Sequence, residues 1–141
     1  MIKKNALFLL VLLSFKALAF EESTEIMCFT SYGEKPINIK YVTFYSKKDK
    51  VYLGYVKYEK SDTAIPINFV KDDEILIETR PSIYTIVWNE IIKGEINGTY
   101  TVISQGARFS GFTYKNKAGK EVEFDENWRA YDEKIGDCVW K

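Results

Sequence analysis

The side chains that could support catalysis in this sequence are carboxylates, because its 141 residues include no histidine. Ser-His-Asp triads, Cys-His pairs and most catalytic zinc sites are therefore excluded. The acidic residues cluster at 72–74, at 125–126 and at 132–133. A glycosidase-type acid and base would need one such carboxyl group in an apolar pocket, which raises its pKa. All three clusters fall in predicted turns or on a solvated helix face, so we expect surface carboxylates and no enzyme.

Metal and cofactor sites have no clear sequence signal. Asp125, Glu126 and Asn127 offer oxygen ligands for calcium but lack a recognised loop spacing. The glycines are spaced as turn residues and do not cluster in a phosphate-binding loop that opens a helix. Asn97-Gly98-Thr99 fits a glycosylation sequon and also a two-residue hairpin turn, and we favour the turn. We therefore expect no metal and no cofactor.

The first 19 residues are predicted to be a cleaved export signal. Lys3 and Lys4 form a basic start, residues 6–15 are apolar, and Ala17-Leu18-Ala19 matches a small-residue cleavage site. Residues 20–141 would then form a single β domain that is periplasmic or secreted. Two cysteines in an exported chain predict one disulfide bond, Cys28–Cys138, with a pair of reactive thiols as the alternative.

The charge balance argues against two classes of partner. Loss of the signal with its three lysines leaves 17 basic residues against 20 acidic, a net charge of −3. Binding to nucleic acid requires a basic field that displaces counterions, and anionic membranes attract basic segments. We expect neither nucleic-acid binding nor membrane insertion after signal cleavage.

Alternating apolar residues and regular turn signals predict an all-β fold. Residues 51–58 separate into two faces with a period of two, which is typical of a half-buried antiparallel strand. Trp88 lies in the most apolar segment, 83–92, and is expected to anchor the core. Pro66 predicts that the strand at 64–70 is short or at an edge, and residues 71–73 are expected to turn. Other strands are expected at 26–32, 37–45 and 74–79.

Residues 94–124 are predicted to form a β-meander. Its three turn signals are Asn97-Gly98, Gln105-Gly106 and residues 116–119. The tail differs, because Phe124, Trp128, Tyr131 and Ile135 recur at helical spacing, with Asp125 and Gly136 suited to cap a helix at about 126–134. The expected architecture is a small antiparallel β-barrel or sandwich of about eight strands, with one short C-terminal helix, closed by one disulfide.

Ser110-Gly111-Phe112-Thr113-Tyr114 has the pattern Ser-Gly-x-x-Tyr. This pattern, with a cysteine near each end of the chain, resembles the periplasmic and membrane-bound inhibitors of c-type lysozyme. The resemblance implies an eight-stranded antiparallel barrel whose motif loop enters the lysozyme cleft. Ser110 and Tyr114 would then make polar contacts with the enzyme, and Lys115 or Lys117 would approach its catalytic carboxylates. Alternation along the chain also allows residues 110–114 to be a strand, with Tyr114 in the core.

These observations favour a protein that binds a partner without transforming it. Ten tyrosines are present, and exposed tyrosine is common in binding surfaces. We expect an exported, non-enzymatic inhibitor or immunity-type protein that acts on a secreted enzyme or toxin, with a c-type lysozyme among the candidates. The alternatives are a carrier that holds a small ligand inside the barrel, which requires an internal void, and an envelope structural protein.

Overall fold

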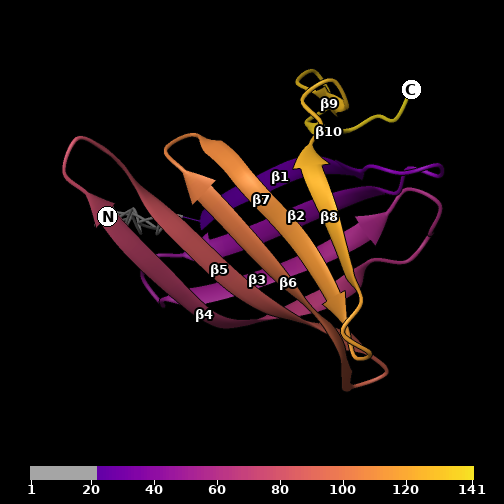
Figure 1. Ribbon diagram of the computed structural model, residues 1–141, viewed down its shortest axis with the longest axis horizontal. Coiled ribbons are helices and arrows are strands. Elements are labelled where there is room, and N and C mark those ends of the chain that lie inside the picture. Colours follow the sequence, from indigo (N-terminus) through magenta and orange to yellow (C-terminus); the bar gives the residue numbers. More distant parts are fainter. Residues whose placement is uncertain (1–21) are drawn as a thin grey trace, which may run out of the picture.

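The computed structural model describes residues 22–141, which form a closed antiparallel β-barrel of eight strands (Figure 1). The predicted export signal lies outside the described residues. The barrel strands follow one another around the wall in chain order, and the last strand pairs with the first. They are β1 (Glu22–Ser31), β2 (Asn38–Ser46), β3 (Val51–Tyr58), β4 (Ile65–Ile77), β5 (Arg80–Ile92), β6 (Glu95–Gln105), β7 (Arg108–Asn116) and β8 (Glu121–Glu126).

Closure of the sheet distinguishes the barrel from the sandwich that the sequence also allowed. Three residue pairs join β8 to β1, from Phe29↔Glu126 to Ser31↔Phe124. Every neighbouring pair is antiparallel, and each pair of consecutive strands forms a hairpin. The all-β prediction and the strand number are thus confirmed. The described residues contain no helix that is long and apolar enough to cross a membrane.

Aromatic rings fill the middle of the barrel. Trp88 is fully buried, as predicted, and its ring meets Tyr41 edge to face. Phe29 stacks on Phe112 with ring centroids 4.3 Å apart, and Tyr100 packs beside Phe112. Alternate residues of each strand point inward, so the period of two in the sequence becomes one layer of packed rings. Rings of this size each bury a large apolar area and dominate the energetics of the core.

The turn predicted at Asn97-Gly98 was wrong, because both residues lie inside β6. The chain reverses four residues earlier, at Lys93 and Gly94, whose φ angles of 52° and 78° are those of a two-residue hairpin turn. Position 98 requires glycine for a steric reason and not for a turn, because a Cβ there would overlap the ring of Tyr114 on the neighbouring strand. The glycine therefore accommodates a close approach between strands.

The strand containing Pro66 is long, and the break predicted at residues 71–73 does not occur. β4 runs for 13 residues, with a register shift between Phe69 and Lys71. It pairs with β3 only from Ile65 to Asn68, whereas its pairing with β5 continues to Ile77. The outer half of β4 is therefore an edge, and its charged residues, Lys71, Asp72, Asp73 and Glu74, are of the kind that discourage edge-to-edge association.

The C-terminal helix predicted at 126–134 was also wrong. Glu126 is the last residue of β8, and the following residues form turns and a small hairpin of β9 (Tyr131–Asp132) and β10 (Asp137–Cys138). Gly136, expected as a helix cap, has a φ of 64° and lies in the turn of that hairpin. So short a helix is marginal on its own, and here attachments to β1 outweigh the local preference.

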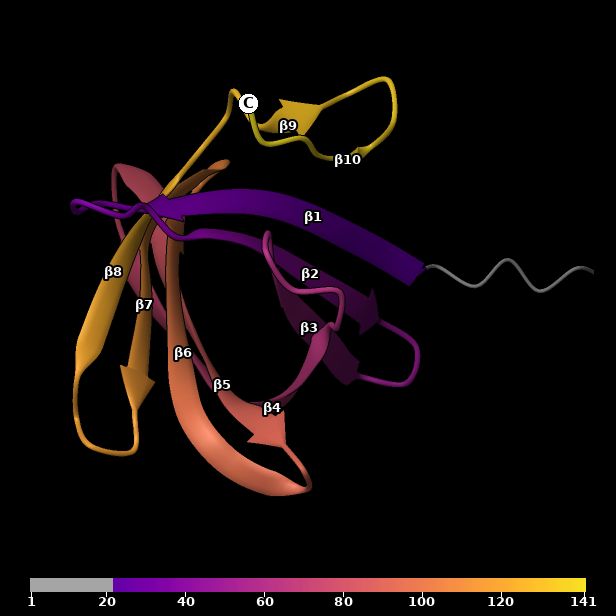
Figure 2. The same ribbon diagram turned by 90° about the vertical axis from the view of Figure 1, so that its right-hand side faces the viewer.

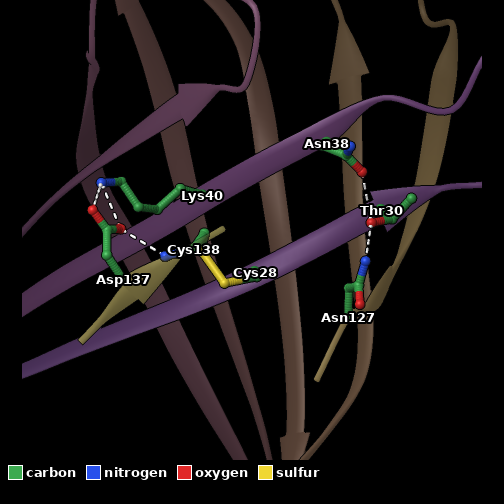
Figure 3. The surroundings of a disulfide bond; sticks show 7 residues. All are labelled: Cys28, Thr30, Asn38, Lys40, Asn127, Asp137 and Cys138. Atoms are coloured by element: carbon green, nitrogen blue, oxygen red, sulfur yellow. Dashed lines mark hydrogen bonds and ion pairs between the residues drawn. A yellow bond between two sulfur atoms is a disulfide. The ribbon is translucent and has the colours of Figure 1, made fainter. Parts of the chain in front are cut away.

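Those attachments hold the tail against the outside of β1 and β2, as Figures 2 and 3 show. The predicted disulfide Cys28–Cys138 joins β1 to β10. The backbone N–H of Asn127 donates to the carbonyl of Cys28 (2.8 Å), and its side-chain amide donates to Thr30 (2.9 Å). Lys40 on β2 forms an ion pair with Asp137 at 2.9 Å. The disulfide also indicates an oxidising environment.

Candidate partner-binding site

The Ser-Gly-x-x-Tyr residues lie in a strand and not on a projecting loop. Ser110, Gly111 and Tyr114 all belong to β7. Ile103 pairs with Gly111 and Ser104 pairs with Phe109, so Ser110 is the extra residue of a β-bulge. Lys115 forms an ion pair with Glu121 across the β7–β8 hairpin (3.5 Å). Lys117 is exposed in the turn that follows β7.

Tyr114 points into one end of the barrel, where its hydroxyl donates to Glu90 at 2.9 Å. The same carboxyl group accepts hydrogen bonds from the amide of Asn97 (2.7 Å) and the hydroxyl of Tyr100. The amide of Asn97 also donates to the Tyr114 hydroxyl at 3.1 Å. Glu90 is only 2% exposed, so these donors replace the water that a carboxyl group would otherwise bind. We call Glu90, Asn97, Tyr58, Tyr100 and Tyr114 the Glu90 network.

The directions of the hydrogen bonds in the Glu90 network follow from proton counting. Tyr100 has one hydroxyl proton, which it donates to Glu90. The Tyr58 hydroxyl lies 2.8 Å from that of Tyr100 and must therefore be the donor between the two. Tyr114 of the motif packs against the core, as the strand interpretation expected, and its hydroxyl belongs to the Glu90 network.

Alkaline pH is expected to destabilise the fold through the buried tyrosines. Burial raises the pKa of Tyr41, Tyr58, Tyr100 and Tyr114 above the ordinary value of 10, and the nearby Glu90 adds to this for the last three. The folded state therefore holds these protons more tightly than the unfolded chain. Their contribution to stability is complete below pH 10 and falls above it, by up to about 1.4 kcal/mol per pH unit for each tyrosine.

Urea unfolding at about pH 8 and about pH 11, followed by circular dichroism and by tyrosinate absorbance, tests this expectation. We expect a lower midpoint at the higher pH and tyrosinate absorbance that rises together with unfolding. Gradual ionisation of all ten tyrosines in the folded protein would contradict it.

A groove of about 430 Å³ lies beside the tail, between β1 and the start of β7. One wall is β1, the second is the start of β7 with Phe109, and the third is the tail with Trp128 and Tyr131. The Trp128 side chain is 64% exposed although it lines this hollow. Phe109 is adjacent in sequence to Ser110, so the groove begins where the Ser-Gly-x-x-Tyr motif begins.

Glu126 gives the groove its distinctive chemistry. Its Oε2 atom is buried and has no hydrogen-bond partner in the part of the chain that the structure describes. Burial raises the pKa of this carboxyl group, and a hydrogen bond from the Phe109 backbone partly lowers it. Glu25 and Glu133 line the same groove. Residues 125–126 were expected to be solvated surface carboxylates. For Glu126 that expectation was wrong, because one of its carboxylate oxygens is buried.

Sequence reasoning missed the groove residues because the disulfide and the tail brought them together. Glu25 and Glu126 are about one hundred positions apart, and Trp128 was assigned to a helix stripe. The one available signal was the position of Glu126 between Phe124 and Trp128, an acidic residue within an aromatic segment.

No family model, curated protein or solved structure matches this chain. Within residues 22–141, no three acidic residues or cysteines converge as a metal site. The groove, with its exposed indole and its unpartnered carboxylate oxygen, is therefore the candidate site.

Proposed function

We propose that this is an exported, non-enzymatic binding protein that neutralises a secreted enzyme or toxin by occupying it, with the groove beside the tail as its binding site. The observation that carries the proposal is the exposed Trp128 on the wall of a hollow that is open to solvent. Tryptophan is enriched among the residues that dominate binding energy at protein interfaces. A solvent-exposed indole in a concave site can become buried when a partner protein binds.

The packed interior supports this proposal over the carrier alternative. Five fully buried aromatic residues contact one another through the middle of the barrel: Phe29, Tyr41, Trp88, Tyr100 and Phe112. A carrier needs a preformed space of several hundred Å³ for its ligand. The groove beside the tail has a volume in that range, whereas these rings occupy the middle of the barrel.

The c-type lysozymes remain the most specific candidate partner, because of the motif residues Ser110, Tyr114, Lys115 and Lys117. Tyr114 donates to Glu90, so its hydroxyl is occupied inside the barrel. Contact with lysozyme would therefore depend on the β7 bulge, the turn lysine and the adjoining groove.

The proposal is tested with a lysis assay for c-type lysozyme and with columns that carry the protein, exposed to secreted proteins in culture medium. Trp128→Ala and Ser110→Ala are compared with Ile135→Ala, which removes a side chain of the same tail that is 65% exposed. We expect a secreted enzyme or toxin that the wild type and Ile135→Ala retain and inhibit. Trp128→Ala should weaken the inhibition about tenfold or more.

If lysozyme responds, and Ser110→Ala weakens the response, the motif is part of the interface. If lysozyme does not respond, the lysozyme form of the proposal is wrong. If no secreted protein distinguishes the Trp128→Ala column from the wild-type column, the groove is not a protein-binding site.

A further inference from the structure

The charges of the side chains that line the groove restrict the kind of ligand that can bind there. The three acidic side chains of its lining are those of Glu25, Glu126 and Glu133, and the lining contains no lysine or arginine. A buried carboxylate oxygen in a folded protein normally has a donor, yet Glu126 Oε2 has none among residues 22–141. The acidic lining has no positive charge of its own, which favours a cationic ligand.

The aromatic wall further restricts the choice among cations. Trp128 and Tyr131 line the groove and are both exposed. A guanidinium group is planar, stacks on aromatic faces and donates to a carboxylate in a fixed fork, whereas an ammonium group is a compact and strongly hydrated charge. We propose that the groove binds an arginine side chain of the partner, with the guanidinium stacked on Trp128 and hydrogen-bonded to Glu126. This inference rests on the proposed function, because it names the partner's contact residue.

Two cations of the described residues lie beside the groove. Arg108 lines an adjoining hollow of about 440 Å³ together with Phe109, Glu126 and Trp128, and Arg129 lines another with Glu126 and Trp128. Glu126 Oε2 has no partner among residues 22–141. Because Arg108 would repel a second guanidinium, its removal should favour an incoming arginine.

The raised pKa of Glu126 agrees with this assignment. Burial of the carboxyl group raises the pKa because no counter-charge compensates for the lost hydration. A bound guanidinium would favour the ionised form and would lower this pKa. Binding should therefore strengthen as pH rises through the pKa of Glu126 and then level off.

The test uses N-acetyl-arginine amide as the probe, titrated into the full mature protein while the indole N–H signal of Trp128 is followed by NMR. N-acetyl-citrulline amide has nearly the same shape without the charge, and N-acetyl-lysine amide has the charge without the plane. We expect a saturable shift with the arginine probe. Both other probes should bind at least tenfold more weakly.

The variants locate the contact. Glu126→Gln should weaken binding of the arginine probe about tenfold, and Arg108→Gln should strengthen it. Glu121→Gln serves as the matched control, because it removes an exposed carboxylate from the same strand, and it should leave binding unchanged. Thermal unfolding of each variant verifies that the fold is intact.

The inference is overturned if citrulline or lysine amide binds as tightly as the arginine probe, or if Glu126→Gln binds it as well as the wild type. Failure of the proposed function gives a different result: the probe binds through Glu126, but no secreted protein is retained on the columns. A retained protein that Glu126→Gln holds equally well would support the function and overturn the arginine contact.

Discussion

Replacement of Cys28 and Cys138 by alanine is expected to lower the free energy of unfolding by about 4 to 5 kcal/mol. The two cysteines are 110 positions apart, so the bond closes almost the entire described chain. In the chain-entropy model a loop of this size removes a large part of the conformational freedom of the unfolded state. Few interactions in a domain whose total stability is about 5 to 15 kcal/mol make a larger contribution.

The measurement is urea unfolding of the double variant, compared with the wild type in oxidising and in reducing buffer. Lys40→Met is the control, because it breaks the ion pair with Asp137 beside the disulfide but leaves the covalent bond. Asp137 is partly exposed, so the control should lose less than about 1 kcal/mol. Equal stability of the double variant and the wild type would show that the bond does not constrain the unfolded chain as inferred.

The sequence predicted an antiparallel barrel or sandwich of about eight strands because the strands are encoded locally. The alternation in residues 51–58 matches β3 residue for residue, and the apolar segment around Trp88 became the core of β5. The disulfide also followed from composition and the expected export. These features require no knowledge of distant contacts, since a period of two and a turn fix which face of each strand is buried.

Two of the structural errors, the turn at Asn97-Gly98 and the C-terminal helix, arose where distant contacts outweighed local preference. Asn97-Gly98 has strong turn propensity, but Lys93-Gly94 makes the turn and Gly98 accommodates the ring of Tyr114. The predicted C-terminal helix had good spacing and caps, but the disulfide and the Asn127–Cys28 hydrogen bond hold that segment as turns. These contacts join residues that are far apart in the chain, so a local window of sequence does not reveal them.

The candidate site was the least predictable part. The resemblance at residues 110–114 implied a projecting loop, whereas these residues lie in β7 and the tyrosine hydroxyl bonds to Glu90. Glu126 was assigned to the surface because its burial depends on β1 and on Phe109, which are remote in the chain. Prediction of a raised pKa requires the three-dimensional environment, and here that environment is built by the tail.

Replacement of Glu90 by alanine is expected to lower the free energy of unfolding by about 3 kcal/mol or more. The change removes the acceptor for Asn97, Tyr100 and Tyr114 together. A buried donor without a partner costs about 1 to 3 kcal/mol, and the truncated side chain leaves a cavity in addition. Because Tyr58 donates to Tyr100, the loss also disturbs the next hydroxyl of the Glu90 network.

Two further variants separate the network from simple loss of volume. Glu90→Gln keeps the shape but replaces one acceptor oxygen with a donor that faces hydroxyl groups, so it should cost about 2 kcal/mol. Tyr114→Phe removes one donor and leaves the carboxyl group with two others, so it should cost about 1 kcal/mol. The expected order of stability, measured by urea unfolding near neutral pH, is wild type, Tyr114→Phe, Glu90→Gln and Glu90→Ala.

The order of the two Glu90 variants decides what the carboxyl group does. If hydrogen bonding dominates, Glu90→Gln is clearly less stable than the wild type although its volume is the same. If Glu90→Gln equals the wild type, the site tolerates an amide, and Glu90→Ala is destabilising only through its cavity. The alkaline titration gives an independent check: the charge of Glu90 helps to raise the pKa of Tyr100 and Tyr114, so these tyrosines should ionise at lower pH in Glu90→Gln.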